Sequence, residues 1–214
     1  DKLVTGVQTC ALPICKEEHT ETPVNVKRKV VLWDFGAKAN IGRELVQRGC
    51  EVTVIPAYTK AERIFELAPD GIMLSNGPGD PAENVEIIEE LKKVEEKKIP
   101  TFGICLGHQL LALSQGATTS KLKYGHRGAN QPCENVETGR VYITSQNHGY
   151  AVNNDSLKDG ARVWFVNAND GTCEGIKYDD MPAFSVQFHP EACGGPLDTG
   201  FLFDEFMELI DANK

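Results

Sequence analysis

The chain has 214 residues, which is enough for one α/β domain with a sizeable core. Its formal net charge of −9 is not offset by any basic stripe, which argues against nucleic acid or an anionic membrane surface as a partner. The 7 cysteines show neither C-x-x-C pairs nor zinc-ligand spacing and fit a reducing compartment better than a disulfide framework. No apolar run is long enough to span a bilayer. We therefore expect a cytoplasmic protein.

Residues 1–24 differ in pattern from the rest of the chain. They show no sustained periodicity, no initiator Met and no signal-peptide layout. The portion V-T-G-V-Q-T-C-A-L-P-I at 4–14 resembles a translated sequencing-adaptor remnant, so we interpret residues 1–24 as an assembly artefact at the end of a partial reading frame. Cys10, Cys15 and His19 are accordingly given no functional role. A region upstream of Asp1 is expected to be missing.

From Lys27 onward, apolar strands alternate with amphipathic helices. This alternation predicts a mostly parallel sheet covered by helices on both faces, within a single domain at 25–214. The expected strands are 30–33, 51–55, 71–74 and one starting at 101, and the expected helices are 41–48, 61–67, 83–97 and 201–210. Beyond Gly116 the pattern is more β-like, with strands expected at 119–124, 139–144, 161–166, 175–178 and 183–188, which predicts an additional antiparallel region in the C-terminal half.

Cys105 lies where the strand starting at Thr101 runs into a helix. Gly103 and Gly107 flank it two residues away on either side, as a sharp strand-to-helix turn requires. At the first turn of a helix, unpaired N–H groups and the positive end of the helix dipole favour a thiolate. Most lone cysteines are buried structural residues, but the flanking glycines favour a nucleophile here.

A cysteine nucleophile needs a base and an acceptor that orients the base. His189 ends the apolar strand F-S-V-Q-F, and Glu191 follows two residues later. His108, one helical turn beyond Cys105, reads as a packing or hydrogen-bonding residue. His126 lies in what we expect to be a glycine-rich loop, and neither of these two histidines has a carboxylate next to it in sequence. His189 and Glu191 are therefore the predicted partners of Cys105.

Acyl transfer also needs donors directed at the developing oxyanion. The backbone N–H of Leu106, directly after the nucleophile, is one candidate. The loop S-N-G-P-G-D-P at 75–81 follows a strand of the same sheet, and Gly77 within it allows close approach of the backbone to a substrate. An ordinary β-turn is the alternative interpretation of this loop.

Together these motifs resemble a known family. G-I-C-L-G-H-Q at 103–109, S-N-G-P-G-D-P at 75–81 and F-H-P-E at 188–191 are similar to the motifs of triad-type (class I) glutamine amidotransferases. D-F-G-A-K-A-N-I at 34–41, G-H-R-G-A-N-Q-P at 125–132 and T-S-Q-N-H-G-Y-A-V at 144–152 resemble the glutaminase half of the carbamoyl-phosphate synthase small subunit. The resemblance covers about 29–209 and implies a flavodoxin-like fold.

The resemblance implies a role for each matched residue. Cys105 would attack the side-chain amide of L-glutamine, His189 would carry the proton to the leaving ammonia, and Glu191 would orient His189. The amides of Gly77 and Leu106 would hold the oxyanion. The remaining substrate contacts would come from Gly79, Gln109, Asn147, Gly149 and Tyr150.

The resemblance also implies a partner. Ammonia would pass to a large synthetase subunit that makes carbamoyl phosphate for pyrimidine and arginine biosynthesis, and ATP and Mg would be needed only in that subunit. No metal or organic cofactor is expected in this chain. The alternatives are a stand-alone cysteine hydrolase, a glutaminase serving another synthetase, such as one for anthranilate or GMP, and an inactive fragment that only binds.

The sequence departs from the family pattern in two respects. Family members carry an N-terminal domain that contributes a serine to the glutamine site, and residues 1–24 do not match it. After H-P-E the family usually has a stretch like S-P-G-P, whereas this chain has A-C-G-G-P at 192–196. Cys193 would lie near the proposed base, where it is either tolerated or interferes by oxidation.

Overall fold

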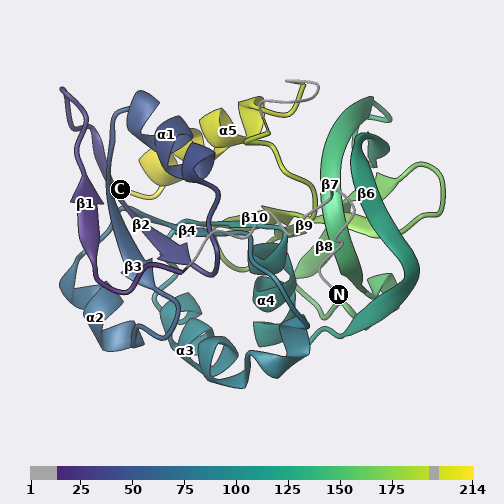
Figure 1. Cartoon of the computed structure of the whole chain (residues 1–214), viewed down its shortest axis with the longest axis horizontal. Helices are drawn as coiled ribbons and strands as arrows, with labels where there is room; N and C mark the ends of the chain where they lie inside the picture. The colour runs from purple at the N-terminus through teal and green to yellow at the C-terminus, as the bar shows by residue number, and fades with distance from the viewer. Residues whose placement is uncertain (1–13, 193–197) are drawn as a thin grey trace, which may run out of the picture.

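A single ten-stranded sheet runs through the molecule (Figure 1). The computed structural model describes residues 14–192 and 198–214. The strand order is β1-β3-β2-β4-β5-β10-β9-β8-β6-β7. Cys10 and Cys193 lie outside the described residues. Within those residues no helix combines the length and apolar character needed to cross a membrane.

The parallel half of the sheet corresponds to the alternating region of the sequence. It consists of β2 (Arg28–Asp34), β3 (Cys50–Pro56), β4 (Gly71–Leu74), β5 (Thr101–Ile104) and β10 (Ala183–Val186). Its inner strands β4, β5 and β10 are buried at every residue because both faces are covered. Since parallel strands share a direction, the loops after β2, β4, β5 and β10 open at the same edge, where ligands bind in such sheets.

The antiparallel half extends the sheet beyond β10. It is built from β9 (Cys173–Tyr178), β8 (Ala161–Asn167), β6 (Thr119–Asn135) and β7 (Val141–Val152). The expected antiparallel region is therefore confirmed. In Figure 1, β6 and β7 form a long curved pair at the end of the sheet opposite β1.

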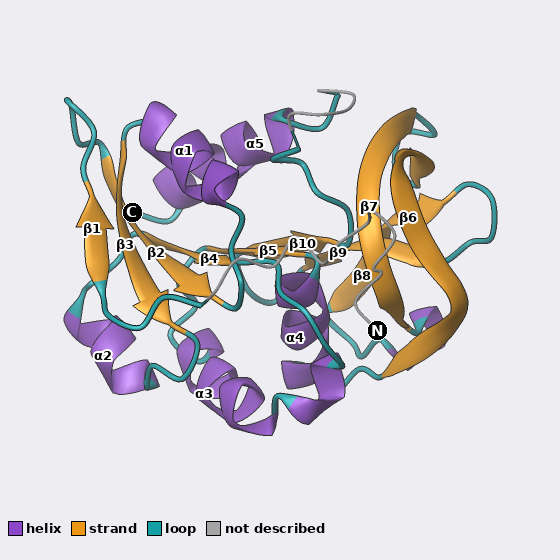
Figure 2. Cartoon of the chain, in the orientation of Figure 1, coloured by secondary structure: helices purple, strands orange, loops and turns teal. Residues whose placement is uncertain are grey.

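Helices cover both faces of the parallel half (Figure 2). On one face lie α1 (Ala39–Gln47) and α5 (Phe201–Ala212), and on the other lie α2 (Ala61–Glu66), α3 (Val85–Glu95) and α4 (Leu106–Ser114). Each face has its own apolar core: Phe102 and Phe206 belong to one core, and Trp33 and Leu110 belong to the other. Two short 3₁₀ turns, η1 (Pro81–Glu83) and η2 (Asn154–Ser156), complete the elements.

Two expected elements are corrected by the structure. The single helix expected at 83–97 is instead η1 followed by α3, because the Asp80 side chain accepts a hydrogen bond from Ala82 N (3.0 Å) and closes a separate short turn. The strand expected at 119–124 continues to Asn135. Gly125 (φ 69°) and Gly128 (φ 138°) lie next to irregularities in the β6 register, so they accommodate bulges within the strand rather than ending it.

Part of the N-terminal segment joins the sheet. β1 (His19–Glu21) pairs antiparallel with β3, with Thr20 opposite Thr53. Cys15 N donates to Asp34 Oδ2 at 2.7 Å. Residues 15–21 thus form hydrogen bonds with the same fold, contrary to the expectation that residues 1–24 stand apart. The domain limit at residue 25 itself stays a prediction.

Candidate active site

Cys105 occupies a strained turn between β5 and α4. Its φ of 54° and ψ of −101° lie where a residue with a β-carbon is disfavoured. A hydrogen bond from Cys105 N to Val186 O (2.9 Å) on β10 holds the turn. A β-carbon at Gly107 would lie 2.4 Å from the Leu74 carbonyl oxygen, and one at Gly103 would lie 2.9 Å from the Gly107 backbone. Both glycines are therefore required by close backbone contact, as the sequence predicts.

His189 is held by a buried carboxylate. It follows β10 in the chain, and its Nδ1 lies 2.8 Å from Glu191 Oε1. Lys38 Nζ lies 3.3 Å from that same oxygen, and Asn40 Nδ2 donates to the Glu191 backbone carbonyl at 2.5 Å. The end of β10 is thereby tied to the start of α1, which fixes the direction of the imidazole ring.

The charges around His189 favour the imidazolium. Burial alone would lower its pKa, but the neighbouring Glu191 and Cys105 outweigh burial and raise the pKa from 6.5 to about 10. Burial would raise the pKa of the Glu191 carboxyl. The positive charges of His189 and then Lys38 outweigh burial and lower this pKa below its ordinary value. The pair is therefore set to hold an imidazolium next to the Cys105 sulfur.

Two backbone amides border the nucleophile. Leu106 is the first residue of α4, so its N–H has no acceptor within the helix. Gly77, in the loop after β4, packs tightly: a β-carbon there would lie 2.4 Å from the Phe35 carbonyl oxygen and 2.6 Å from Leu106 Cδ2. Only glycine allows this loop to approach Phe35 and Leu106 so closely.

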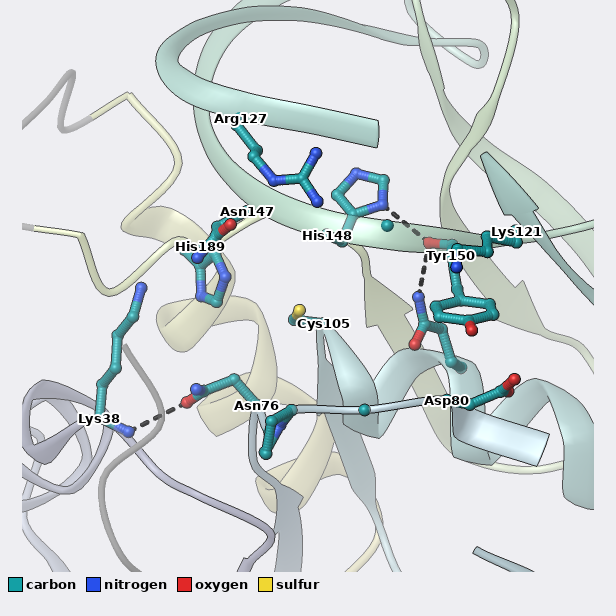
Figure 3. A pocket seen from close by; sticks show the side chains of 15 residues that line it. Lys38, Asn76, Asp80, Cys105, Lys121, Arg127, Asn147, His148, Tyr150 and His189 are labelled. Carbon is teal, nitrogen blue, oxygen red and sulfur yellow. Dashed lines mark hydrogen bonds between the residues drawn. The ribbon is translucent and has the colours of Figure 1, made fainter. Parts of the chain in front are cut away.

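A pocket opens over Cys105 (Figure 3). It is lined by loops that follow strands of the parallel half of the sheet and by residues of the curved strand β7. Among the lining residues, Cys105 and His189 supply reactive groups and Lys38 and Arg127 supply positive charge. The other lining residues are Asn76, Gly77, Pro78, Gly79, Asp80, Gln109, Lys121, Asn147, His148, Gly149 and Tyr150.

Gln109 links α4 to β7 across the pocket. Its Nε2 donates to the Tyr150 backbone carbonyl (2.7 Å) and to Gln187 Oε1 (2.8 Å). Both amide hydrogens are thus used within the protein, so only the Gln109 carbonyl oxygen is left to accept from a bound molecule. His148 Nδ1 lies 2.8 Å from the same Tyr150 carbonyl (Figure 3). Burial lowers the pKa of His148 to about 4, so this ring is neutral and its Nδ1 carries the proton.

The sequence as a whole fits one family model. Residues 31–209 match the model described as glutamine amidotransferase class-I. This chain belongs to the class-I glutamine amidotransferases. The strained cysteine turn and the His189–Glu191 pair of this amidotransferase both lie within the matched residues.

Named relatives are similar along the whole chain. The carbamoyl phosphate synthase small chain of Staphylococcus saprophyticus is 51% identical over 224 residues, covering 100% of this chain and 60% of the relative. The small chain of Fusobacterium nucleatum is 56% identical over 219 residues, covering 100% of this chain and 61% of the relative. That of Methanocaldococcus jannaschii is 50% identical, covering 97% of this chain and 58% of the relative. The amidotransferase thus spans about three fifths of the length of these relatives.

Two solved structures share the fold. A protein described as a putative GMP synthase subunit, from Thermoplasma acidophilum, aligns with a TM-score of 0.75 at 22% identity, over 91% of this chain and 97% of the other. A glutamine amidotransferase from Thermotoga maritima aligns with a TM-score of 0.64 at 19% identity, over 87% and 85%. The predicted class-I amidotransferase fold is therefore confirmed.

The structure brings most of the predicted site residues of the amidotransferase together. Eight of them line the pocket: Gly77, Gly79, Cys105, Gln109, Asn147, Gly149, Tyr150 and His189. Glu191 lies behind His189 and Leu106 begins α4, so these two are neighbours of the pocket without being among its lining residues. The roles of all ten stay predictions.

Sequence reasoning missed several pocket residues and placed one histidine wrongly. Lys38 and Asn76 lie within the motifs at 34–41 and 75–81. Their place in these motifs was the only feature of the sequence that could have marked them as pocket residues. His108 is buried with its Nδ1 2.8 Å from Ser185 Oγ, which confirms a packing and hydrogen-bonding role. His126 lies within β6 rather than in a loop, and carboxylates distant in sequence lie within hydrogen-bonding distance of both its ring nitrogens.

Proposed function

We propose that this chain is a glutaminase that hydrolyses L-glutamine to glutamate and ammonia through a cysteine thioester. The observation that carries this proposal is a strained, pocket-lining Cys105 beside His189, a histidine held by the buried Glu191. Family membership supports the same chemistry.

The reaction would proceed in two acyl-transfer steps. The Cys105 sulfur attacks the side-chain amide carbon of glutamine, and the Gly77 and Leu106 amides hold the oxyanion. His189 transfers its proton to the departing nitrogen, so the C–N bond breaks and ammonia leaves a γ-glutamyl thioester on Cys105. Water then attacks the thioester with the neutral His189 as general base, which releases glutamate and restores the thiolate–imidazolium pair.

The pocket has groups suited to a free amino acid. Lys38 and Arg127 are positively charged and can attract the substrate α-carboxylate, whereas Asp80 can attract its α-ammonium. Gly79, Gln109, Asn147, Gly149 and Tyr150 would make the remaining contacts. The Gln109 carbonyl oxygen is suited to accept from an N–H group of the substrate, since both hydrogens of its own amide are engaged.

The named relatives support a destination for the ammonia. We propose delivery to a large synthetase subunit that makes carbamoyl phosphate, as part of pyrimidine and arginine biosynthesis in the cytoplasm. ATP and Mg would act in that subunit, and neither a metal nor an organic cofactor is needed for the hydrolysis. Similarity to carbamoyl phosphate synthase small chains along the whole sequence favours this destination over an anthranilate or GMP synthetase.

A glutamine-analogue chloroketone tests the hydrolytic role. We expect one equivalent of label on Cys105, identified by peptide mass spectrometry, and protection by excess glutamine. Cys105→Ala should abolish both labelling and ammonia release, while Cys15→Ala, at a half-buried cysteine that does not line the pocket, should leave both unchanged. Glutamine-protected labelling that persists in Cys105→Ala would refute the assignment.

A further inference from the structure

A second cluster of reactive side chains borders the glutamine pocket, and one of its members, His148, also lines that pocket. His126 on β6, His148 on β7 and Glu174 on β9 each offer one donor atom, and these atoms all lie within 4.8 Å of one another. We propose that His126, His148 and Glu174 form a binding site for a divalent transition-metal ion, with Zn²⁺ as the best fit. This inference does not depend on the proposed glutaminase activity.

The orientation of His148 is the first argument. Its Nδ1 faces the Tyr150 carbonyl, which can only accept, so Nδ1 carries the proton of the neutral ring. The lone pair on Nε2 then faces two more oxygens, Gln146 Oε1 at 3.0 Å and Glu174 Oε1 at 3.8 Å. The His148 lone pair and the Gln146 oxygen repel each other unless a cation lies between them, whereas Glu174 Oε1 also lies 3.0 Å from His126 Nδ1, which can donate to it.

The amide of Gln146 is held in this orientation by its other end. Its Nε2 donates to Cys133 Sγ (3.1 Å) and to Thr144 Oγ1 (3.1 Å), which keeps the Gln146 oxygen directed toward His148. Exchanging the amide oxygen and nitrogen would lose the bond to Thr144 Oγ1, because this hydroxyl donates its hydrogen to the Gln131 carbonyl (2.9 Å), whereas the Cys133 thiol would donate to the exchanged oxygen. The excess of acceptors around His148 Nε2 is therefore built into the packing.

Glu174 supplies the second argument. Its side chain is fully buried, and its carboxylate interacts with the His126 ring and with the Asn167 side chain. Burying a carboxylate is costly, and metal coordination is one way to compensate that cost. The Oε1 atom lies 3.0 Å from His126 Nδ1, so the carboxylate is already placed between both rings.

The remaining partner of His126 fits the same interpretation. Its Nε2 lies 2.9 Å from Asp170 Oδ2. Metal-bound histidines usually donate their other ring N–H to a carboxylate or a carbonyl, which fixes the ring and raises its basicity as a ligand. Asp170 would play that part for His126, as the Tyr150 carbonyl does for His148.

The ligand set and its spacing favour zinc. Two imidazoles and one carboxylate are a common Zn²⁺ set, and tetrahedral bonds to N and O ligands put the donor atoms about 3.3 Å apart. The two N–O separations of 3.0 and 3.8 Å lie on either side of that value, and the two ring nitrogens lie within 4.8 Å of each other, so the imidazoles would close in slightly on a bound ion. Without a metal, a proton on His126 Nδ1 would bridge to Glu174, so zinc must displace that proton and should bind more tightly as pH rises.

The test measures binding of Zn²⁺ itself, in a Cys105→Ala background that removes the other thiol–imidazole pair able to hold zinc. Competition with a chromogenic chelator should give one equivalent bound, and Co²⁺ in place of zinc should show the visible absorption bands of a low-coordinate site. Glu174→Gln and His126→Gln should each weaken zinc binding by about tenfold or more. His19→Gln, at an exposed histidine on β1, is the matched control and should have no effect.

Each outcome decides the proposal. Zinc that raises the thermal unfolding midpoint of the parent but not that of Glu174→Gln supports it. Equal zinc affinity in the parent and in both cluster variants would assign the ion to other residues, such as the remaining cysteines, and would overturn it. Absence of binding at any pH tested would mean that only a proton occupies the cluster, and would overturn it too.

Discussion

Cys105 combines an unfavourable backbone conformation with the chemistry proposed for it. A non-glycine residue at a φ of 54° costs about 1–3 kcal/mol, which the surrounding packing must offset. The offset comes from close contacts at Gly103 and Gly107 and from the bond between Cys105 N and Val186 O. The strain turns the thiol toward the pocket and leaves the Leu106 N–H at the start of α4 available.

The charge balance at His189 leads to a first prediction. Replacing Glu191 by Gln removes the main charge that raises the His189 pKa, so burial should pull this pKa down from about 10 by at least about one unit. The imidazolium would then be lost at a lower pH, and the alkaline limit of glutamine hydrolysis should move down with it. Ring-carbon NMR titration of His189, assigned by comparison with His189→Gln, measures the shift.

Glu137→Gln is the matched control for that titration. Glu137 pairs with the partly exposed side chains of Arg162 and Lys177, and none of the three lines the pocket. Its replacement should leave the His189 titration unchanged. A His189 pKa that is identical in Glu191→Gln and in the parent would contradict the electrostatic role assigned to Glu191.

Gly77 carries a second prediction at the residue scale. In Gly77→Ala the new methyl group would lie 2.4 Å from the Phe35 carbonyl oxygen, so the loop must retreat and carry its N–H away from Cys105. Loss of one oxyanion donor should lower kcat for glutamine hydrolysis by about 10²-fold or more, with a smaller change in KM. Gly139→Ala, where a β-carbon meets nothing within 4 Å, is strained by its φ of 70° and should lose some stability, but Gly139 does not line the pocket, so the kinetics should be unchanged. Wild-type kcat in Gly77→Ala would show that Gly77 supplies no such donor.

Among the elements, those whose signal is local were predictable. β4 occupies the predicted residues 71–74, and α5 begins at Phe201 as expected, because apolar periodicity and flanking turn residues determine both. β6 was truncated in the prediction because Gly125 and Gly128 are typical of a loop, and only the pairing with β7 shows that they are bulges. The His126–Glu174 contact could not be predicted from the sequence either, because it depends on how far β6 and β7 continue.

The contact between α3 and α4 carries a pH prediction. Glu95, the last residue of α3, accepts from Gln115 Nε2 (2.6 Å) and from the Ser114 hydroxyl, and burial raises its pKa from 4.5 to about 7. The ionised carboxylate is thus disfavoured by folding, and the protein should lose stability as pH rises from 4.5 to 7, by an amount on the order of 3 kcal/mol at most.

Glu95→Gln should remove this dependence. The variant should unfold at a higher temperature than the parent at pH 8 and at nearly the same temperature at pH 4.5, where Glu95 is mostly protonated in the folded state. Thermal unfolding followed by circular dichroism across this range measures the difference. A constant gap between the two proteins from pH 4.5 to 8 would rule out a titration of Glu95.

At the scale of the whole molecule, the pocket belongs to neither half of the sheet alone. Cys105 and Gly77 follow parallel strands, whereas Asn147, Gly149 and Tyr150 come from the curved antiparallel strand β7. The sequence pattern predicted both halves, and the family resemblance named eight of the fifteen lining residues. Neither could predict the Lys38–Glu191 ion pair or the Asn40 contact, which depend on how α1 packs against the end of β10.

The contribution of the N-terminal segment to stability also concerns the whole molecule. β1 is short and exposed, and its pairs with β3 should each be worth about 0.2–1 kcal/mol, so a chain starting at Asn25 should lose about 1–2 kcal/mol and still unfold cooperatively. Removing β1 also uncovers the edge of β3, whose free N–H and C=O groups should promote self-association. Thermal unfolding and sedimentation velocity test both effects. Loss of a cooperative transition in the shortened chain would place the domain boundary before residue 25. A modest loss of stability would instead support a domain at 25–214, provided that glutamine still protects Cys105 from labelling.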